Sequence, residues 1–437
     1  MSRISVDFSK NIGKIKPYNA VNNGPVSRRD VSNIDTWRAL GIPFGRLHDT
    51  SYVDEWLVDV HRVFPDFDAD ENDPKNYIFA PTDAYLARMF TAGTVPYYRL
   101  GASIEHSHKK GTHPPKDFEK WERICEHIIM HYTEGWADGF TYDIRYWEIW
   151  NEPDNYNPTG NPCWQSTPEV FFEFFAAVLP PLQKRFPHLK IGGPAIATVN
   201  HDKWCDDFFA YIKARGLRPD FISYHRYGKT PEDFVEYVRR ANAIFEKYGY
   251  GDVETHINEW NYVRGWRDEA FAHSVESIKG LKGAAFAASV LCSLHPEKLD
   301  MMMYYDGRLS VWCGLYDTDL LKPLKTYHVF SAFKVLADLG TAVKSTVSDD
   351  HVYSLAATDG KSGAVLLTHF DELDGAEGRD VTLTLSALPE NARLEIYLLD
   401  EKNDLALKEI ACCKGHEASL SLSLSPYNSY LIKFASA

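Results

Sequence analysis

Short apolar segments recur along the first three quarters of the chain, and amphipathic stretches separate them. Each segment is rich in large apolar side chains and is followed by a turn signal, which is typical of a buried parallel strand. The stretches between them have apolar residues at helical spacing. Eight strand-helix units predict a (β/α)8 TIM barrel, whose active site would lie at the C-terminal ends of the strands. The predicted strands are residues 20–26, 43–49, 95–103, 146–152, 190–196, 221–228, 255–261 and 301–307.

From residue 341 onward the pattern changes to alternating polar and apolar positions, with turn sequences between the alternating runs. This alternation predicts a C-terminal antiparallel β-sandwich. The amino-terminal segment RISVDFS alternates in the same way and is predicted to add a strand to the sandwich. We therefore expect a catalytic barrel over residues 13–340 and a β-sandwich accessory domain over residues 341–437, together with residues 1–12.

Charge and composition narrow the possible partners. The formal net charge is −14, and no lysine or arginine run is long enough to follow a phosphate backbone, so we expect no nucleic acid partner. No apolar run approaches the length of a membrane span, and the polar amino terminus favours a cytoplasmic protein with no membrane partner. Seven cysteines without a C-x-x-C pair favour free buried thiols over zinc or disulfides. The sequence leaves a homo-oligomer open.

Two glutamates end predicted strands on opposite sides of the barrel. Glu152 ends the fourth strand and Glu259 lies near the end of the seventh, so both side chains are predicted to face the barrel mouth. A single glutamate at a strand end is usually a solvated rim residue, but a pair facing one cleft indicates function. Glycoside hydrolysis needs such a pair, because one group protonates the leaving oxygen and the other attacks or stabilises the sugar cation.

The residues around these glutamates resemble a known group of enzymes. WNEP at 150–153 together with NEWN at 258–261 resembles clan A of the glycoside hydrolases, in which both catalytic glutamates come from these two strands. Three further features resemble glycoside hydrolase family 39, which includes β-xylosidases and α-L-iduronidases. These features are the segment GRLHD, the His-x-Tyr pair in SYHRYG, and the terminal sandwich.

The resemblance implies a retaining double displacement by two glutamates. It makes Glu152 the acid/base, Glu259 the nucleophile and Asn151 the donor to the sugar 2-hydroxyl. We expect the pKa of Glu152 to be raised by an apolar wall of Trp147 and Trp150 and by the negative charge of the nucleophile. Asn258 and Asn261, beside Glu259, are expected to keep the nucleophile ionised and aimed.

Four more residues receive roles from the resemblance. It implies that Tyr227 lies near the nucleophile and His225 at the sugar, while Arg46 and His48 line the floor of the site. A tyrosine hydroxyl can hold a carboxylate both oriented and ionised.

The substrate is predicted to be an oligosaccharide or glycoside with a neutral terminal sugar. Iduronidases resemble this chain but use a lysine where Tyr227 stands, although Arg226 and Arg308 nearby leave a uronate open. An exo-acting enzyme on a β-xyloside is therefore the first hypothesis. The alternatives are an endo-acting or other clan A glycosidase (arabinosidase, glucosidase, galactosidase or iduronidase) and a non-catalytic sugar-binding barrel.

Aromatic and acidic residues near the eighth strand complete the predicted site. Trp312 follows that strand and is predicted to stack on a sugar ring, and Asp306 is predicted to accept a bond from a sugar hydroxyl. Trp260 and Trp266 could also stack or could fill the barrel mouth. Trp150 is predicted to belong to the core.

No metal or other cofactor is expected. His106, His108 and His113 in EHSHKKGTH have no cysteine or carboxylate at ligand spacing, which favours solvated loop residues. The acidic segment DFDADENDPKNY begins like a calcium loop, but Glu71 replaces the required glycine and Tyr77 the final glutamate. That segment is predicted to be an acidic surface turn.

Overall fold

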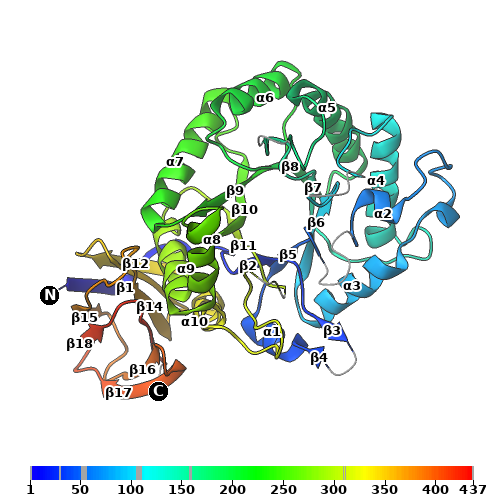
Figure 1. Cartoon of the computed structure of the whole chain (residues 1–437). Coiled ribbons are helices and arrows are strands. Elements are labelled where there is room, and N and C mark those ends of the chain that lie inside the picture. Colours follow the sequence, from blue (N-terminus) through cyan, green and yellow to red (C-terminus); the bar gives the residue numbers. More distant parts are fainter. Residues whose placement is uncertain are drawn as a thin grey trace.

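Eight parallel strands close into a barrel at the centre of the molecule (Figure 1). The computed structural model describes residues 2–28, 31–50, 57–104, 111–156, 160–308, 310 and 312–435. Each barrel strand overlaps one of the eight predicted segments, so the predicted TIM barrel is confirmed. In order around the barrel, the strands are β2 (Ala20–Asn22), β5 (Phe44–Arg46), β6 (Val95–Leu100), β7 (Tyr146–Ile149), β8 (Lys190–Ile196), β9 (Phe221–Gly228), β10 (Glu254–Tyr262) and β11 (Met301–Tyr304).

Helices form a ring outside the barrel (Figure 1). Capping residues define the helix ends, as helix α7 (Pro231–Tyr248) shows. At its start the Thr230 hydroxyl accepts a 3.2 Å bond from the Asp233 N–H, and at its end Gly249 adopts the left-handed conformation with φ 87°. The helices are α1 (Ile34–Leu40), α2 (Val60–Val63), α3 (Ala80–Thr91), α4 (Phe118–Thr133), α5 (Pro168–Arg185), α6 (Asp202–Ala214), α7 (Pro231–Tyr248), α8 (Asp268–Lys279), α9 (Leu281–Leu294) and α10 (Lys325–Leu339), with a 3-10 turn η1 (Pro74–Asn76). Within the described ranges no single helix has the length and apolar composition to cross a membrane, and α8 with α9 meets that criterion only as a pair bent by 80°.

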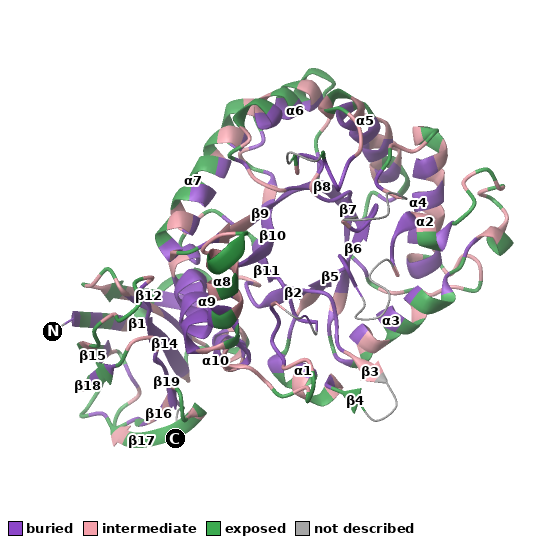
Figure 2. Cartoon of the chain, in the orientation of Figure 1, coloured by how far each residue is buried: buried purple, intermediate pink, exposed green. Residues whose placement is uncertain are grey.

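The barrel interior has an apolar layer near the N-terminal ends of the strands and a polar layer closer to their C-terminal ends. Near the N-terminal ends of the strands, the interior is filled by one cluster of side chains: Ala20, Tyr97, Tyr146, Phe221, Met301 and Met303. Two residues further along three of these strands stand Asn22, Glu148 and Ser223, which point to the same side because strand side chains alternate. All of these residues are buried (Figure 2). The polar layer supports the C-terminal end of the barrel.

A nine-stranded sheet beside the barrel forms the second part of the molecule. Its neighbours are antiparallel except for β1 and β15, which are parallel, so the predicted sheet domain is confirmed. Its order is β17 (Asp404–Cys412), β16 (Arg393–Leu399), β19 (Ser429–Phe434), β14 (Gly363–His369), β13 (Val352–Thr358), β12 (Thr341–Val347), β1 (Ser2–Lys14), β15 (Arg379–Ser386) and β18 (Glu417–Leu424). A separate two-stranded ribbon joins β3 (Ser27–Arg28) and β4 (Val31–Ser32).

The amino terminus belongs to this sheet. Strand β1 pairs with β12 and β15, and it runs two residues past the predicted limit at residue 12. Helix α10 ends at Leu339 and β12 begins at Thr341. We therefore propose residues 13–340 as the barrel domain, and residues 341–437 together with 1–12 as the sheet domain. All seven cysteines are free. Six of them are buried as expected, and Cys412 is exposed.

The sheet domain also touches a loop that leads to the barrel mouth. The Tyr262 hydroxyl donates to Glu372 at 2.9 Å, and Arg264 Nε donates to the same carboxylate at 2.6 Å. Both donors come from the end of β10 and the residues that follow it. The sheet domain therefore helps to hold the segment that comes directly after Glu259.

Candidate active site

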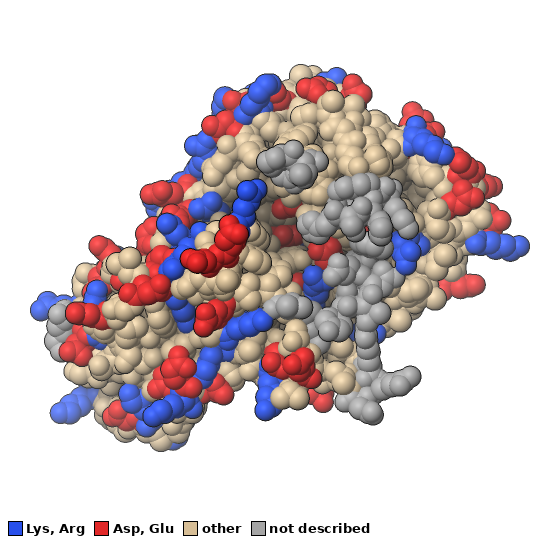
Figure 3. Space-filling view, viewed as in Figure 1, with Lys and Arg blue, Asp and Glu red and all other residues tan. Residues whose placement is uncertain are grey.

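A cavity of about 1030 Å³ lies at the C-terminal ends of the barrel strands. The hollow at the centre of the face in Figure 3 contains acidic side chains. One side, the β7–β9 wall, is lined by Glu152, Asn155, Tyr156, Thr198, His201 and Arg226. The other side, the β10–β5 wall, is lined by Glu259, Trp266, Tyr305, Arg308, Trp312 and His48. The two predicted glutamates thus face each other across one cavity.

Glu152 lies on the turn after β7 in an unusual backbone conformation. Its φ is 48° and that of Trp150 is 76°, values that are sparsely populated for residues other than glycine. The Glu152 N–H donates to the Ala195 carbonyl at 2.9 Å, which fixes the turn against β8. Such strained positions persist where the surroundings determine them, and they cluster at functional sites. The turn directs the carboxylate into the cavity.

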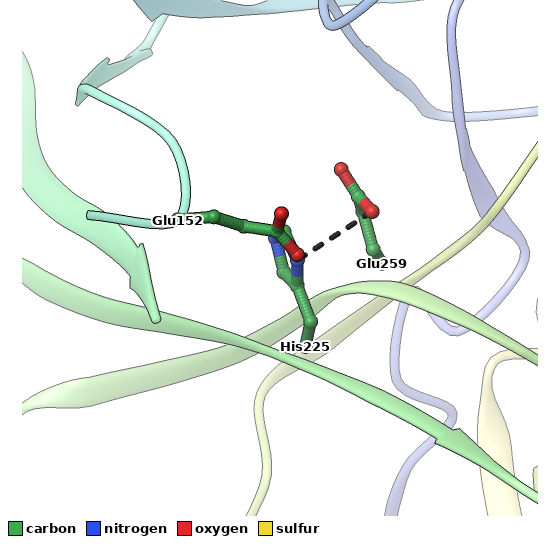
Figure 4. Close-up of side chains that lie close together, drawn as sticks. All are labelled: Glu152, His225 and Glu259. Carbon is green, nitrogen blue, oxygen red and sulfur yellow. Dashed lines mark hydrogen bonds and ion pairs between the residues drawn. The ribbon is translucent and has the colours of Figure 1, made fainter. Parts of the chain in front are cut away.

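His225 connects the two carboxylates (Figure 4). Its Nδ1 lies 2.9 Å from Glu152 Oε1 and 3.5 Å from Glu259 Oε2, and the ring is fully buried. Burial opposes a charged imidazole, but the carboxylates of Glu259 and Glu152 outweigh burial and raise the pKa of His225. His225 therefore bridges the two carboxylates, and its surroundings favour the protonated ring.

The pKa of Glu152 differs from the expectation. Burial favours its neutral form, but the hydrogen bond and charge of His225 outweigh burial and lower the pKa of Glu152. Asn155 Nδ2 donates to Oε2 at 2.7 Å and the Cys163 thiol at 3.6 Å, and both lower the pKa further. The expected rise from an apolar wall was wrong because the wall next to this carboxylate is polar.

The two tryptophans proposed for that wall lie in the core. Trp147 Nε1 donates to the Ile144 carbonyl at 2.9 Å, and Trp150 Nε1 donates to the Cys163 carbonyl at 2.8 Å. Neither lines the cavity. The prediction that Trp150 belongs to the core is confirmed, and Trp260 is buried there as well.

Glu259 is held by strong donors. Arg46 Nη1 donates to Oε1 at 2.8 Å and the Tyr227 hydroxyl to Oε2 at 2.8 Å. The Glu259 side chain is only 6% exposed. The expected support from Asn258 and Asn261 was wrong: Asn258 donates to Glu148, and Asn261 donates to the Tyr305 carbonyl at 2.6 Å.

Arg46 organises the polar layer beneath the cavity. Besides Glu259, its guanidinium binds Glu148 Oε2 at 2.7 Å and Asn151 Oδ1 at 2.6 Å. Because Arg46 occupies the amide oxygen of Asn151, the Asn151 Nδ2 has no protein partner within the described ranges. Asn151 therefore keeps an unused donor, but it is buried and does not line the cavity. Arg46 itself is fully buried and does not line the cavity.

The β10–β5 wall holds the remaining predicted residues. His48 lines the cavity, and burial together with nearby arginines lowers the pKa of His48 well below its usual range, so the ring is neutral. Trp312 lines the cavity and stacks on Tyr305 with ring centroids 5.8 Å apart. Asp306 does not line it: the side chain is fully buried, accepts a 2.9 Å bond from Arg308, and has its pKa raised to about 7, mainly by burial.

Sequence reasoning missed three residues that position the glutamates. Glu148 binds Arg46 and accepts a 2.5 Å bond from Ser223, and its signal was a carboxylate in the middle of an apolar strand. Asn155 and Cys163 bind Glu152. They come from the loop after β7, where the sequence has no pattern that would have identified them.

One group in the described part of the chain has the composition of a metal site. Glu152, His225 and Glu259 each offer a ligand atom, and these atoms lie within 4.8 Å of one another. The sequence predicts all three residues at the barrel mouth but no metal site there. His113 lies on an exposed turn, while His106 and His108 fall outside the described residues. In the acidic segment Asp70 accepts a bond from its neighbour Asn72, as in a surface turn.

Comparisons with known proteins identify the family. The beta-xylosidase of Geobacillus stearothermophilus is 26% identical over 302 residues, covering 60% of this chain and 56% of that protein. The beta-xylosidase of Caldicellulosiruptor saccharolyticus is 25% identical over 300 residues, covering 61% and 57%. The chain thus spans little more than half the length of these curated relatives.

A solved structure and a family model complete the comparison. The structure of a glucosidase from Croceicoccus marinus covers 100% of this chain and 99% of that one, with a TM-score of 0.83 at 21% identity, which establishes a shared fold. The model described as glycosyl hydrolases family 39 matches residues 5–268, which is more than half of the chain. The chain therefore belongs to glycosyl hydrolase family 39.

Proposed function

We propose that this protein is a retaining glycoside hydrolase that removes a neutral pentose, such as a β-xylosyl residue, from the end of a glycoside or oligosaccharide. One observation carries the proposal: oxygens of Glu152 and Glu259 lie within 4.8 Å of each other in one cavity. Retaining enzymes hold their carboxyl groups about 5–5.5 Å apart, whereas inverting ones leave roughly 6.5–9.5 Å for a water molecule. The short separation supports direct attack by a carboxylate.

Glu259 is the nucleophile in this mechanism. Its oxygen bonds to the anomeric carbon as the bond from that carbon to the leaving oxygen breaks, and Glu152 delivers a proton to that oxygen. Water then attacks the glycosyl-enzyme ester from the side of the departed group. Glu152 takes a proton from this water, and Glu259 is released as a carboxylate. The two donors from Arg46 and Tyr227 support this role, since they favour an ionised and fixed carboxylate.

His225 explains how Glu152 can be an acid although its pKa is lowered. The imidazolium and the carboxylate share one proton across the 2.9 Å contact, and the two groups titrate as a unit. Moving that proton from Nδ1 to Oε1 gives a neutral histidine and a protonated Glu152. As the leaving oxygen gains negative charge, the proton passes on to it.

Two groups at the site are suited to hold the sugar, one buried beneath the cavity and one on its wall. Asn151 Nδ2 has no partner among the described residues and is suited to donate to the 2-hydroxyl, a bond that strengthens in the transition state. Trp312 offers an aromatic face to the C–H side of the ring. A neutral sugar is favoured because Arg308, the cation on this side, is already paired with Asp306.

A panel of 4-nitrophenyl pentosides and hexosides tests the proposal. We expect turnover of the β-xyloside, in keeping with the two relatives named beta-xylosidases, and the glucoside belongs in the panel because of the glucosidase of similar fold. Proton NMR of early product should find the anomeric configuration of the substrate. Inverted product would refute the mechanism, and no turnover with any sugar would favour a non-catalytic sugar-binding barrel.

A further inference from the structure

Arg226 lines the cavity, and no acidic side chain in the described part of the chain pairs with it. Among the arginines around the site, Arg46 is paired with Glu148 and Glu259, and Arg308 with Asp306. Arg226 forms no hydrogen bond or ion pair with any described residue, and its Nε is buried without a partner. A partly buried guanidinium that lacks a counter-ion is unfavourable unless a ligand supplies one.

Two aromatic rings hold the arginine in place, where an acidic side chain would be usual. Its guanidinium carbon lies 4.7 Å from the ring centre of Tyr237 and 5.8 Å from that of Phe234. Tyr237 is fixed in turn, because its hydroxyl accepts a 2.7 Å bond from the Val199 N–H. These rings hold the guanidinium without accepting a hydrogen bond from it, and a guanidinium with free donors can bind a carboxylate through two parallel bonds.

A second basic side chain, His201, lies on the same wall. His201 Nδ1 is 3.1 Å from the fully buried Asp154, and this hydrogen bond raises the pKa of His201. Asp154 is itself fixed by the N–H groups of Ala197 and Thr198, at 2.7 and 3.1 Å. His201 and Arg226 therefore both line the β7–β9 wall of the cavity.

This surface lies on the side of the leaving group. Glu152 follows β7, and the barrel order places β8 and β9 next to it, whereas Glu259 on β10 lies beyond them. The leaving oxygen must meet Glu152, so the group attached to it extends along the β7–β9 wall. A second hollow of about 410 Å³ shares Tyr156 and His201 with the cavity and continues outward past Trp204. The wall has room for a leaving group the size of a sugar.

We propose that Arg226, assisted by His201, forms a subsite for a carboxylate on the leaving group, so that the natural leaving group is an acidic sugar. This inference rests on the proposed function, because it requires a leaving group at Glu152. A local cation also offsets the repulsion that an acidic substrate meets from a chain of net charge −14.

The test compares two substrates within each variant. Both carry the sugar that the panel identifies, and their leaving groups are 4-carboxyphenol and the neutral 4-carbamoylphenol. We expect the wild type to favour the acidic substrate by about tenfold in kcat/KM, as one charge-assisted bond would give in a partly exposed site. Arg226→Gln should bring the ratio near one after correction for leaving-group reactivity, and Arg226→Lys should give an intermediate value.

Arg215→Gln is the matched control. Arg215 also lies over a tyrosine ring, that of Tyr211, at 3.4 Å, but it is exposed at the C-terminal end of α6 outside the cavity, and its loss changes the net charge equally. The control should keep the wild-type ratio. Equal ratios in wild type and Arg226→Gln would overturn the subsite while leaving the glycosidase proposal intact. Both substrates are measured with the same protein sample, so a partly misfolded variant lowers both kcat/KM values equally and leaves their ratio unchanged.

A binding measurement makes the test independent of turnover. The sulfur-linked β-xyloside analogues of the same two leaving groups resist hydrolysis and can be titrated by calorimetry. We expect the acidic analogue to bind about tenfold tighter to the wild type and equally to Arg226→Gln. Equal binding to the wild type would overturn the subsite, even if no glycoside in the panel is hydrolysed.

Discussion

The two glutamates of the cavity occupy contrasting surroundings. Glu259 is held by Arg46 and Tyr227, both from barrel strands, and its side chain is 6% exposed. Glu152 stands on a turn, is 15% exposed, and takes two of its donors from the loop that follows β7. One carboxylate is therefore fixed and the other shares a proton with His225. This difference is what separates a nucleophile, which must be aimed, from an acid, which must exchange protons.

The largest effect is expected for Glu259→Gln. Removing the nucleophile should lower kcat by roughly 10⁴-fold or more with every leaving group, the scale of losses for covalent catalytic residues. The exposed Glu236→Gln on α7 is the control and should leave kcat unchanged.

Labelling checks the same role in the wild type. A 2-deoxy-2-fluoro glycoside with a good leaving group should inactivate the enzyme and leave its sugar on Glu259, as peptide mapping would detect. Label on another residue would overturn the assignment.

Glu152→Gln should have a smaller effect that depends on the substrate. We expect a loss of about 10²–10⁴-fold with poor leaving groups, the usual scale of acid catalysis, and far less with activated aryl leaving groups. The measurement is kcat/KM across phenols of different acidity. Equal losses with all of them would remove Glu152 from the acid role and erase the contrast with Glu259.

Tyr227→Phe removes one of the donors to Glu259 and leaves the other. A hydrogen bond to a charged group is worth about 1.5–3 kcal/mol, so kcat/KM should fall about 10- to 100-fold with all leaving groups alike. Tyr142→Phe, outside the cavity, serves as the control. A loss confined to poor leaving groups would mean that Tyr227 acts on the acid instead.

The sequence predicted the parts of this site that depend on strand periodicity. The eight strands and the opposed positions of Glu152 and Glu259 follow from apolar runs and turn signals, which are local. Glu148 could have been found by the same reasoning, since a carboxylate inside an apolar strand needs a buried cation, and Arg46 is one.

The sequence could not predict which partner each glutamate would choose. Trp147 and Trp150 lie five and two residues before Glu152, yet both side chains are buried in the core. Trp147 alternates with the inward-facing Glu148 along β7, and the turn at Trp150 and Glu152 has positive φ values. Asn258 and Asn261 flank Glu259 but bind Glu148 and the backbone. The direction of these side chains depends on contacts between strands that are distant in the sequence, so no local sequence pattern predicts that direction.

His225 gives a pH test of the shared proton. The pKa of His225 is raised above the usual 6.5. The ring keeps its proton at pH values below this raised pKa and loses it as the pH rises through the raised pKa. The basic limb of the kcat/KM profile should therefore lie above pH 6.5. In His225→Asn the remaining proton sites are carboxyl groups, and the limb should move to lower pH. The exposed His188→Asn should not move it. An unchanged limb in His225→Asn would show that the histidine does not take part in the titration.

The smallest expected effect is that of removing metal ions. Glu152, His225 and Glu259 have the composition of a metal site, yet the proposed mechanism uses all three as acid, proton carrier and nucleophile. A metal bound to them would neutralise the nucleophile and displace the proton on His225, because ligands bind metal in their deprotonated forms. Dialysis against EDTA should therefore leave kcat/KM unchanged, measured with the best substrate of the panel. Loss of activity that returns with a divalent cation would overturn the contrast between the two glutamates, since both would then be ligands of one ion.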